Sequence, residues 1–364
     1  YVKVTQTPAM KKYHDLGTAE NMLVLNELHA LPWRNLQTTH DENVHGISGQ
    51  RFAEELLLRK TACAACPVGC IHVGLLREKF AEQNEFLYRQ VSYDHEPIFA
   101  AGSMLGVTSA GGVLALLDEM ERQGVDAMSA GVALAWATEA FESGVVTEKE
   151  TLVPLSFGGV ETYREAVRHL GLRTNDFYRF LGQGTLTAAT HYGGRDFACV
   201  LGQEMAGYAT GEVFFASQAY GFRHSHLDSA GYSYDQKADS RKSEDAAAFL
   251  MEEERRRVQL TCMVACLFAR NVYSEDLLQE CLASVGCPRL AESVVARSSE
   301  VQAKRWQLKF RTGYNPLDIA IPKRFGEVST WKGEIDTVFM HEVASRYQHA
   351  VRKLVDAVQS VQSS

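Results

Sequence analysis

The sequence predicts a mainly α, multihelical fold made of two helical domains. Apolar residues recur at helical spacing along most of the chain, and only eight prolines interrupt its 364 residues. Strand-like alternation is confined to short pieces such as residues 212–216. A stretch rich in Val, Thr, Pro and Gly over residues 147–159 marks a boundary. We therefore expect one domain over residues 1–150 and the other over residues 151–364.

The helices expected in the first domain have clear ends. Ser48 is placed to cap a helix whose apolar face includes Phe52, Leu56 and Leu57. A second apolar stripe over residues 113–120 ends at Gly124, and a third over residues 133–141 ends at Gly144. Glycine favours such ends because it readily adopts the left-handed conformation that stops a helix.

The second domain continues the same periodicity. Helices are expected over residues 160–171, 185–192, 243–270, 274–285, 290–311 and 330–361. The helix over residues 243–270 would place Cys262 and Cys266, four residues apart, on one face.

Composition and charge exclude several classes of protein. The chain is 46% hydrophobic and 23% charged, which is typical of a soluble globular protein. Its net charge of −8 gives no indication of a nucleic-acid partner. No apolar run reaches the ~18 residues that span a membrane, and no signal peptide opens the chain. We therefore expect a cytoplasmic protein with no membrane or nucleic-acid partner.

The eight cysteines are unevenly distributed. Three form the run Cys63-Ala-Ala-Cys66-Pro-Val-Gly-Cys70, and two more lie at positions 262 and 266. Cytosolic thiols stay reduced, so grouped cysteines favour a metal site over disulfides. Three thiolates on one loop favour an iron–sulfur cluster completed by a distant cysteine, with Cys262 and Cys266 as candidates. Zinc, a redox-active thiol pair and inert buried cysteines are the alternatives.

Several stretches, in sequence order, resemble one known family. The first covers residues 17–35 and leads into the cysteine run, and the second is Gly-Val-Asp-Ala-Met-Ser-Ala-Gly at residues 124–131. The third is Ala-Cys-Leu-Phe-Ala at residues 265–269. Together with the cysteine run, they resemble the second and third domains of the tungsten- and molybdenum-dependent aldehyde ferredoxin oxidoreductase family.

This resemblance implies cofactors, a partner and an activity. The family binds tungsten or molybdenum through the dithiolenes of two pterins, with a [4Fe-4S] cluster beside one of them. It oxidises small aldehydes to carboxylic acids and passes the electrons to ferredoxin. On this resemblance the cluster ligands are Cys63, Cys66, Cys70 and Cys266, which favours Cys266 over Cys262.

The family also binds its pterins through two motifs, Asp-x-x-Gly-Leu-Asp and Asp-x-x-Gly-Leu-Cys. The first resembles residues 121–126, which implies pterin contacts by Glu121, Gly124 and Asp126. The second resembles residues 261–266, where Thr261 replaces the leading carboxylate. A hydroxyl can still accept a hydrogen bond, but it loses the charge-assisted part.

The resemblance further implies a glutamate and a histidine near the metal. Residues 93–97, Tyr-Asp-His-Glu-Pro, match the glutamate segment at Glu96, and residues 217–224 match the histidine segment at His224. Either residue could accept a proton when water attacks an aldehyde, and His95 competes with Glu96 for that role. The structural alternatives are that Glu96 only stabilises the amino-terminal end of a helix that begins near Pro97, and that His224 is a surface residue.

Departures from the family pattern widen these expectations. The Asp and Arg expected within residues 202–211 are missing, and the stretch after about residue 306 matches poorly. No β-rich, pterin-binding base domain precedes the matched region, and the chain starts at Tyr1 without an initiator methionine. We expect a fragment or processed subunit without this amino-terminal domain, and a separate pterin-binding domain or subunit is an expected partner. The alternatives are a non-catalytic electron-transfer or scaffold subunit, and a divergent enzyme acting on another substrate such as an aryl-coenzyme A.

Overall fold

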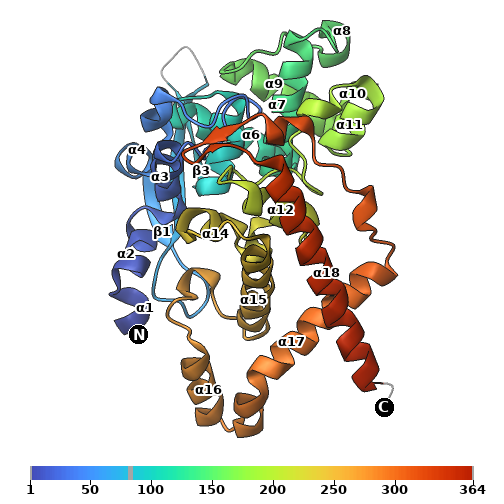
Figure 1. Cartoon of the computed structure of the whole chain (residues 1–364). Helices are drawn as coiled ribbons and strands as arrows, with labels where there is room; N and C mark the ends of the chain where they lie inside the picture. Colours follow the sequence, from blue (N-terminus) through green and yellow to red (C-terminus); the bar gives the residue numbers. More distant parts are fainter. Residues whose placement is uncertain (1, 81–84, 363–364) are drawn as a thin grey trace.

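The computed structural model describes residues 2–80 and 85–362 and confirms the mainly α fold (Figure 1). The first half contains α1 (Val2–Thr5), α2 (Pro8–Asp15), α3 (Asn21–Glu27), α4 (Gly49–Glu55), α5 (His95–Ala101), α6 (Ala110–Gln123), α7 (Ala127–Glu142), α8 (Glu148–Thr151), α9 (Val160–Leu172) and α10 (Asp176–Leu181). The second contains α11 (Thr185–Tyr192), α12 (Glu212–Tyr220), α13 (His226–Ser229), α14 (Gly231–Lys237), α15 (Ser243–Cys262), α16 (Glu275–Ser284), α17 (Pro288–Arg311) and α18 (Thr337–Gln362). The strands are β1 (Leu57–Thr61), β2 (Ile71–Lys79), β3 (Phe86–Tyr93), β4 (Ser329–Thr330) and β5 (Gly333–Glu334).

Several helix ends are where local residues predict them. Ser48 caps α4, because its hydroxyl accepts a hydrogen bond from the backbone N–H of Arg51 at 3.2 Å. Helix α6 ends at Gly124, whose φ of 67° is left-handed. Helix α7 follows at once, and the Asp126 carboxylate accepts from the Ser129 N–H at 2.8 Å. The cap residues therefore fix the tight turn between α6 and α7.

Two expected elements are wrong, and two expected helix bounds also differ: Leu57 begins strand β1 and not the last turn of α4, and α18 begins only at Thr337, after strands β4 and β5. Residues 212–216 belong to helix α12 and not to a strand; every residue of this helix is buried, so it has no polar face to reveal its period. The helix expected over residues 243–270 ends at Cys262, because Val264 adopts a left-handed φ of 54°. Cys262 and Cys266 therefore do not share a helix face: Cys266 lies in the loop that follows.

An antiparallel sheet, in the order β1-β2-β3, was not expected. Strand β2 is its centre, with Ile71 opposite Thr61 of β1 and His72 opposite Tyr93 of β3. The sheet packs against α6, and a Cβ added to Gly74 would lie 2.9 Å from a methyl of Leu114 on that helix. The hairpin from β1 to β2 carries the three-cysteine run in its loop.

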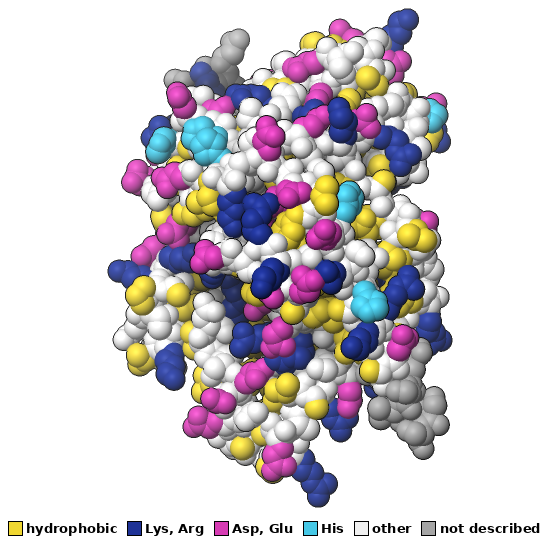
Figure 2. Space-filling view, viewed as in Figure 1, with side chains coloured by type: hydrophobic (Ala, Val, Ile, Leu, Met, Phe, Trp, Pro, Cys, Tyr) yellow, Lys and Arg dark blue, Asp and Glu magenta, His cyan; other side chains and the backbone are white. Residues whose placement is uncertain are grey.

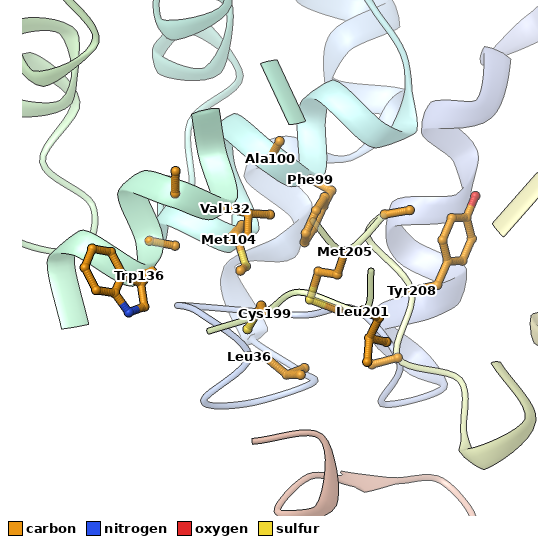
Figure 3. Close-up of a cluster of buried hydrophobic side chains, with 14 of the residues drawn as sticks. Leu36, Phe99, Ala100, Met104, Val132, Trp136, Cys199, Leu201, Met205 and Tyr208 are labelled. Carbon is orange, nitrogen blue, oxygen red and sulfur yellow. The ribbon is translucent and has the colours of Figure 1, made fainter. Parts of the chain in front are cut away.

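Most buried side chains form one large cluster that includes residues from both sides of position 150. Figure 3 shows part of it, where side chains of α5 and α7 pack against the irregular segment that carries Cys199, Leu201, Met205 and Tyr208. Helices α6 and α9 also pack together. The division into residues 1–150 and 151–364 stays a prediction.

A second, small apolar cluster lies apart from the large one. Met10, Val68 and Ala269 are its buried members, and the half-buried Cys66 and Cys70 pack against it. We call it the satellite core. It joins three chain segments: α2, the β1–β2 loop and the loop after α15.

Helices α15, α17 and α18 meet at one buried carboxylate. Glu254 accepts hydrogen bonds from Trp306 Nε1 at 3.0 Å, Gln302 Nε2 at 3.1 Å and the Tyr347 hydroxyl at 3.1 Å. Burial raises the pKa of Glu254. Beyond this junction, α16 and the start of α17 form a hairpin that extends away from the main body (Figure 1).

The surface is mixed in charge, and Figure 2 shows basic and acidic side chains interspersed over the face in view. In the described part of the chain, no single helix has both the length and the hydropathy needed to cross a membrane. A bent pair, residues 95–105 and 110–123, meets the requirement by length and composition alone.

Candidate functional site

The β1–β2 loop presents three cysteines beside the satellite core. Ala65 and Gly69 have left-handed φ values of 61° and 66°, which turn the loop back on itself. The Cys66 N–H donates to the Cys63 carbonyl at 3.0 Å, a contact that tightens the first half of the run. Cys63 is exposed, whereas Cys66 and Cys70 are half-buried. The loop therefore places its thiols at the edge of the molecule with an apolar floor beneath them.

A fourth cysteine approaches this loop from the segment after α15. Burial raises the pKa of the Cys70 thiol, and the neighbouring thiols of Cys266, Cys66 and Cys63 raise it further. Ala269, three residues after Cys266, packs with Val68 of the cysteine loop in the satellite core, so the two segments are neighbours. Cys262 ends α15, and both Cys262 and Cys266 are exposed. The choice of Cys266 as the fourth ligand stays a prediction.

The four cysteines are spread over two loops. Among residues 2–80 and 85–362, no three His, Cys, Asp or Glu side chains converge tightly enough to hold a single metal ion. A four-iron cluster makes a looser demand, because each thiolate binds a different iron. Cys63, Cys66, Cys70 and Cys266 are the residues that would hold it, and the adjacent satellite core would shield one side of it.

A cavity of about 660 Å³ lies next to the cysteines, and we call it the central cavity. Leu267 and Phe268, the two residues after Cys266, line it. Its polar wall includes Asp94, Glu96, Asp126, Tyr208, His226, Tyr232, Lys237, Arg257 and Arg270. Candidate acid–base residues therefore line the same cavity as the two residues that follow Cys266.

The His226 ring and the Glu96 carboxylate are in direct contact in this cavity. His226 Nε2 lies 3.1 Å from Glu96 Oε1, and the Tyr208 hydroxyl donates to the same oxygen at 3.1 Å. Burial would raise the pKa of Glu96, but the hydrogen bond from His226 and the nearby His95 and His226 rings outweigh it and lower the pKa to about 2. Glu96 is therefore a permanently ionised partner of His226. The other ring nitrogen, His226 Nδ1, is buried and has no hydrogen-bond partner among the described residues.

The structure does not bring His224 to Glu96. His224 has a left-handed φ of 56°, and its Nδ1 lies 2.9 Å from the Ala219 carbonyl while its Nε2 lies 3.1 Å from Lys309 Nζ. Burial and the Lys309 charge lower the pKa of His224. The ring thus faces α17, and the histidine that reaches the central cavity is His226, two residues later.

His95, which competes with Glu96 in the sequence, is also placed elsewhere. It is fully buried beneath the start of α5, with Nε2 3.2 Å from the Gly207 carbonyl. Burial lowers the pKa of His95, which favours the neutral ring. His95 therefore supports the wall of the cavity from behind.

The first pterin motif lies at the turn between α6 and α7. Asp126 lines both the central cavity and a neighbouring cavity of about 460 Å³, which Gly124 also lines. Glu121 is exposed on the last turn of α6. The second motif has a matching turn, because Val264 stands at the position of Gly124 with a φ of 54°. Val264 is 94% exposed.

Sequence reasoning missed a pair of residues behind Tyr208. The Tyr232 ring stacks on Tyr208 with ring centroids 5.3 Å apart, and Arg257 Nη2 donates to the Tyr232 hydroxyl at 3.1 Å. Burial acts to raise the pKa of Tyr232, but Arg257 and Arg270 outweigh it and lower that pKa. No periodicity marks these residues, because they meet only when α14, α15 and the segment before α12 pack together.

Comparisons with known proteins identify relatives of this chain. The family model described as aldehyde ferredoxin oxidoreductase, domains 2 and 3, matches residues 1–353. A tungsten-containing aldehyde ferredoxin oxidoreductase from Thermococcus kodakarensis is 28% identical over 184 residues, which cover 50% of this chain and 29% of the relative. The WOR-like subunit of an aliphatic sulfonate oxidoreductase from Pyrococcus furiosus is 24% identical over 222 residues, or 60% of this chain and 34% of the relative.

A solved structure shares the fold. It is the active-site complex BamBC of benzoyl coenzyme A reductase with 1,5-dienoyl-CoA, and it superposes with a TM-score of 0.66 at 13% identity. The match covers 91% of this chain and 57% of that chain. This chain therefore spans only part of the length of each of these proteins.

Proposed function

This chain belongs to the aldehyde ferredoxin oxidoreductase family, and from that membership we propose that it is the cluster-bearing helical part of a tungsten- or molybdenum-pterin oxidoreductase. The proposed reaction oxidises an aldehyde to a carboxylate and passes electrons through a [4Fe-4S] cluster to ferredoxin or a similar acceptor. One observation carries the proposal: the Glu96–His226 pair, Asp126 and the loop of Cys266 meet at the central cavity.

The chain's own residues provide a short route between cavity and cluster. The thiolates of Cys63, Cys66, Cys70 and Cys266 would hold the cluster, and Leu267 and Phe268 separate Cys266 from the cavity. When bound, the metal and its pterins supply the two-electron oxidation. Gly124 and Asp126, at an exposed turn on the cavity edge, are proposed to contact a pterin, with Glu121 on the preceding helical turn.

His226 is the residue that we propose to accept the proton. A carboxyl with a pKa of about 2 takes up almost no protons near neutral pH, so Glu96 is a poor base. Glu96 instead orients the imidazole by holding Nε2, as a buried carboxylate orients histidine in other acid–base sites. This leaves the buried Nδ1 of His226 to take a proton from a water that attacks the substrate.

A second candidate function has its own support. The fold is shared with a complex that acts on a coenzyme A thioester, and one relative is a subunit of a sulfonate oxidoreductase. The alternative is therefore a divergent member that acts on another substrate, such as an aryl-coenzyme A. A further alternative is an iron–sulfur electron-transfer or scaffold subunit that completes a site with a separate pterin-binding partner.

Metal and cofactor content tests these proposals. The chain, purified without oxygen and reconstituted, should contain iron and sulfide in a cluster-like ratio and absorb broadly in the visible range. Iron and sulfide without any pterin or tungsten would contradict catalysis by this chain alone and support the subunit alternative. A colourless protein that contains zinc would contradict the cluster.

A matched pair of variants tests the proton acceptor in the assembled enzyme. His226→Gln should lower aldehyde oxidation by about 100-fold, the lower range for loss of a general base, while iron content stays unchanged. His224→Gln, two residues away and directed at Lys309, should have a much smaller effect. A larger loss of activity in His224→Gln than in His226→Gln would make His224 the catalytic histidine.

The choice of substrate is tested separately: equal turnover of an aryl-coenzyme A and of an aldehyde would favour the second candidate function.

A further inference from the structure

A second cavity, of about 570 Å³, shares part of its wall with the central cavity. We call it the side cavity. Ser233 and Lys237 of α14, Arg257 of α15 and Arg270 of the loop after Cys266 line both cavities. Three of these four shared residues are cationic, so the boundary between the two cavities carries positive charge.

The side cavity has more positive than negative charge. Its lining contains four Lys or Arg residues and two glutamates, and both glutamates already have cationic partners. Glu275 pairs with Arg255, which does not line the cavity. Glu253 lies 3.8 Å from Arg256 and 3.5 Å from Arg257. The carboxylates therefore leave an uncompensated positive charge at the shared wall.

The cations at the shared wall are bound mainly by neutral groups. Arg257 donates from Nη1 to the Leu227 carbonyl at 3.0 Å and from Nη2 to the Tyr232 hydroxyl at 3.1 Å. Arg270 donates from Nη1 to the Leu267 carbonyl at 2.9 Å. Because Arg257 also pairs with Glu253, Arg270 is the guanidinium that its contact orients without neutralising, which leaves Arg270 free to attract an anion.

A buried donor also points to a polar ligand. Gln259 lines the side cavity and is only 2% exposed. Its Oε1 accepts from Arg255 at 3.0 Å, whereas Nε2 has no hydrogen-bond partner among the described residues. A buried donor without a partner destabilises the folded chain. A ligand oxygen in the cavity would remove that destabilisation.

Part of the lining is apolar. Phe249, Leu260 and Leu278 contribute to it, and a volume of about 570 Å³ is in the range of small-molecule pockets. A bare inorganic anion would leave this apolar surface uncovered. A ligand with an apolar body and one anionic end would satisfy both parts of the lining.

From these observations we infer that the side cavity binds an amphipathic carboxylate, with its carboxylate at Lys237 and Arg270 and its apolar body against Phe249, Leu260 and Leu278. Arg suits this ligand because its planar donors match the two oxygens of a carboxylate. Oxidation of an aldehyde yields a carboxylate, so the ligand would be of the product class. That link to the product rests on the proposed function, whereas the binding itself requires neither metal nor pterin.

Equilibrium dialysis of the full chain with labelled benzoate and hexanoate tests the inference. The matched neutral probes are benzamide and hexanamide, which keep the shape and remove the charge, and inorganic phosphate tests a bare anion. Each carboxylate should bind at least tenfold more tightly than its amide, because a hydrogen bond to a charged group is worth more than one to a neutral group. Phosphate should bind more weakly than either carboxylate.

Two variants locate the binding. Lys237→Gln should weaken benzoate binding about tenfold, and Arg270→Gln should do the same. Because Arg270 lies four residues after Cys266, iron content is measured in both variants, and Lys237→Gln reports on the cavity without touching that loop. The control is Arg297→Gln, which removes one charge from an exposed ion pair with Glu300 on α17 and should leave binding unchanged.

Three results would overturn the inference: no carboxylate binding up to millimolar concentration, equal binding of acid and amide, or unchanged binding in both cavity variants. Phosphate that binds as tightly as benzoate would also overturn it, in favour of a simple anion site. Carboxylate binding by a chain that supports no aldehyde oxidation would leave the site standing and reject the proposed function.

Discussion

Replacing Val264 by glycine should stabilise the chain by about 1 kcal/mol. Val264 has a φ of 54° and is 94% exposed, so the change relieves a β-branched residue in the left-handed region and removes almost no buried surface. The left-handed conformation costs an L-residue about 1–2 kcal/mol. Glycine loses about 0.4–1 kcal/mol through its greater freedom in the unfolded chain, which leaves a net gain of about 1 kcal/mol.

Gly124 provides the reciprocal test, because it occupies the matching position of the first motif. Its φ is 67°, and a Cβ added there would meet no other atom within 4 Å. Gly124→Val should therefore destabilise the chain by a similar ~1 kcal/mol through backbone conformation alone. The two substitutions exchange the same side chains at equivalent turns and should have opposite signs.

Urea unfolding followed by circular dichroism measures both changes. Hydrogen exchange at the Ala265 amide, which donates to the Leu260 carbonyl at 2.9 Å, reads the local effect at the end of α15. Exchange there should slow in Val264→Gly. If Val264→Gly lowers the free energy of unfolding, or if Gly124→Val leaves it unchanged, the left-handed backbone at residue 264 does not destabilise the native chain and the reasoning is refuted.

Three further predictions concern the cluster, a buried carboxylate and acid stability. Cys266→Ser should release iron or leave a smaller cluster, whereas Cys262→Ser should keep the whole cluster. Iron and sulfide assays measure both outcomes, and loss of iron in Cys262→Ser but not in Cys266→Ser would make Cys262 the fourth ligand. Glu254→Leu should lower the free energy of unfolding by about 3 kcal/mol or more, since it leaves three buried donors unpaired. An effect no larger than that of the exposed Glu300→Leu would contradict this. The folded pKa of Glu96, about 2, is lower than its usual 4.5, so its stabilisation is complete above about pH 4.5 and is lost as the pH falls toward about 2. The free energy of unfolding, measured over this pH range, should depend less steeply on pH in Glu96→Gln than in the unchanged chain. An equal dependence in both chains would mean that the contact with His226 does not keep the Glu96 carboxylate ionised.

The parts of the fold that single residues determine could be predicted from the sequence. Ser48 caps α4 and Gly124 ends α6 because a hydroxyl acceptor and a permissive φ act locally. The cysteine run was also recognisable, since three cysteines lie within eight residues. The choice of Cys266 rests on the family resemblance and stays a prediction.

The parts that depend on distant neighbours could not be predicted. Strand β1 reads Leu-Leu-Arg-Lys-Thr and has no regular alternation, so only its pairing with β2 makes it a strand. Helix α12 is buried on every side and therefore shows no helical period. His224 and His226 are both plausible in the sequence, and the left-handed backbone at His224 decides which ring reaches Glu96. That conformation results from packing against α17, which no local pattern records.

The satellite core has a consequence for the lifetime of the chain. Met10, Val68 and Ala269 hold the cysteine loops together without sharing the large core that supports the rest of the fold. Oxidative loss of iron would therefore loosen α2 and the two loops while the remaining helices stay folded. Such a locally opened chain offers proteases a cleavage point. The supply of iron for the proposed cluster would then affect the abundance of the protein.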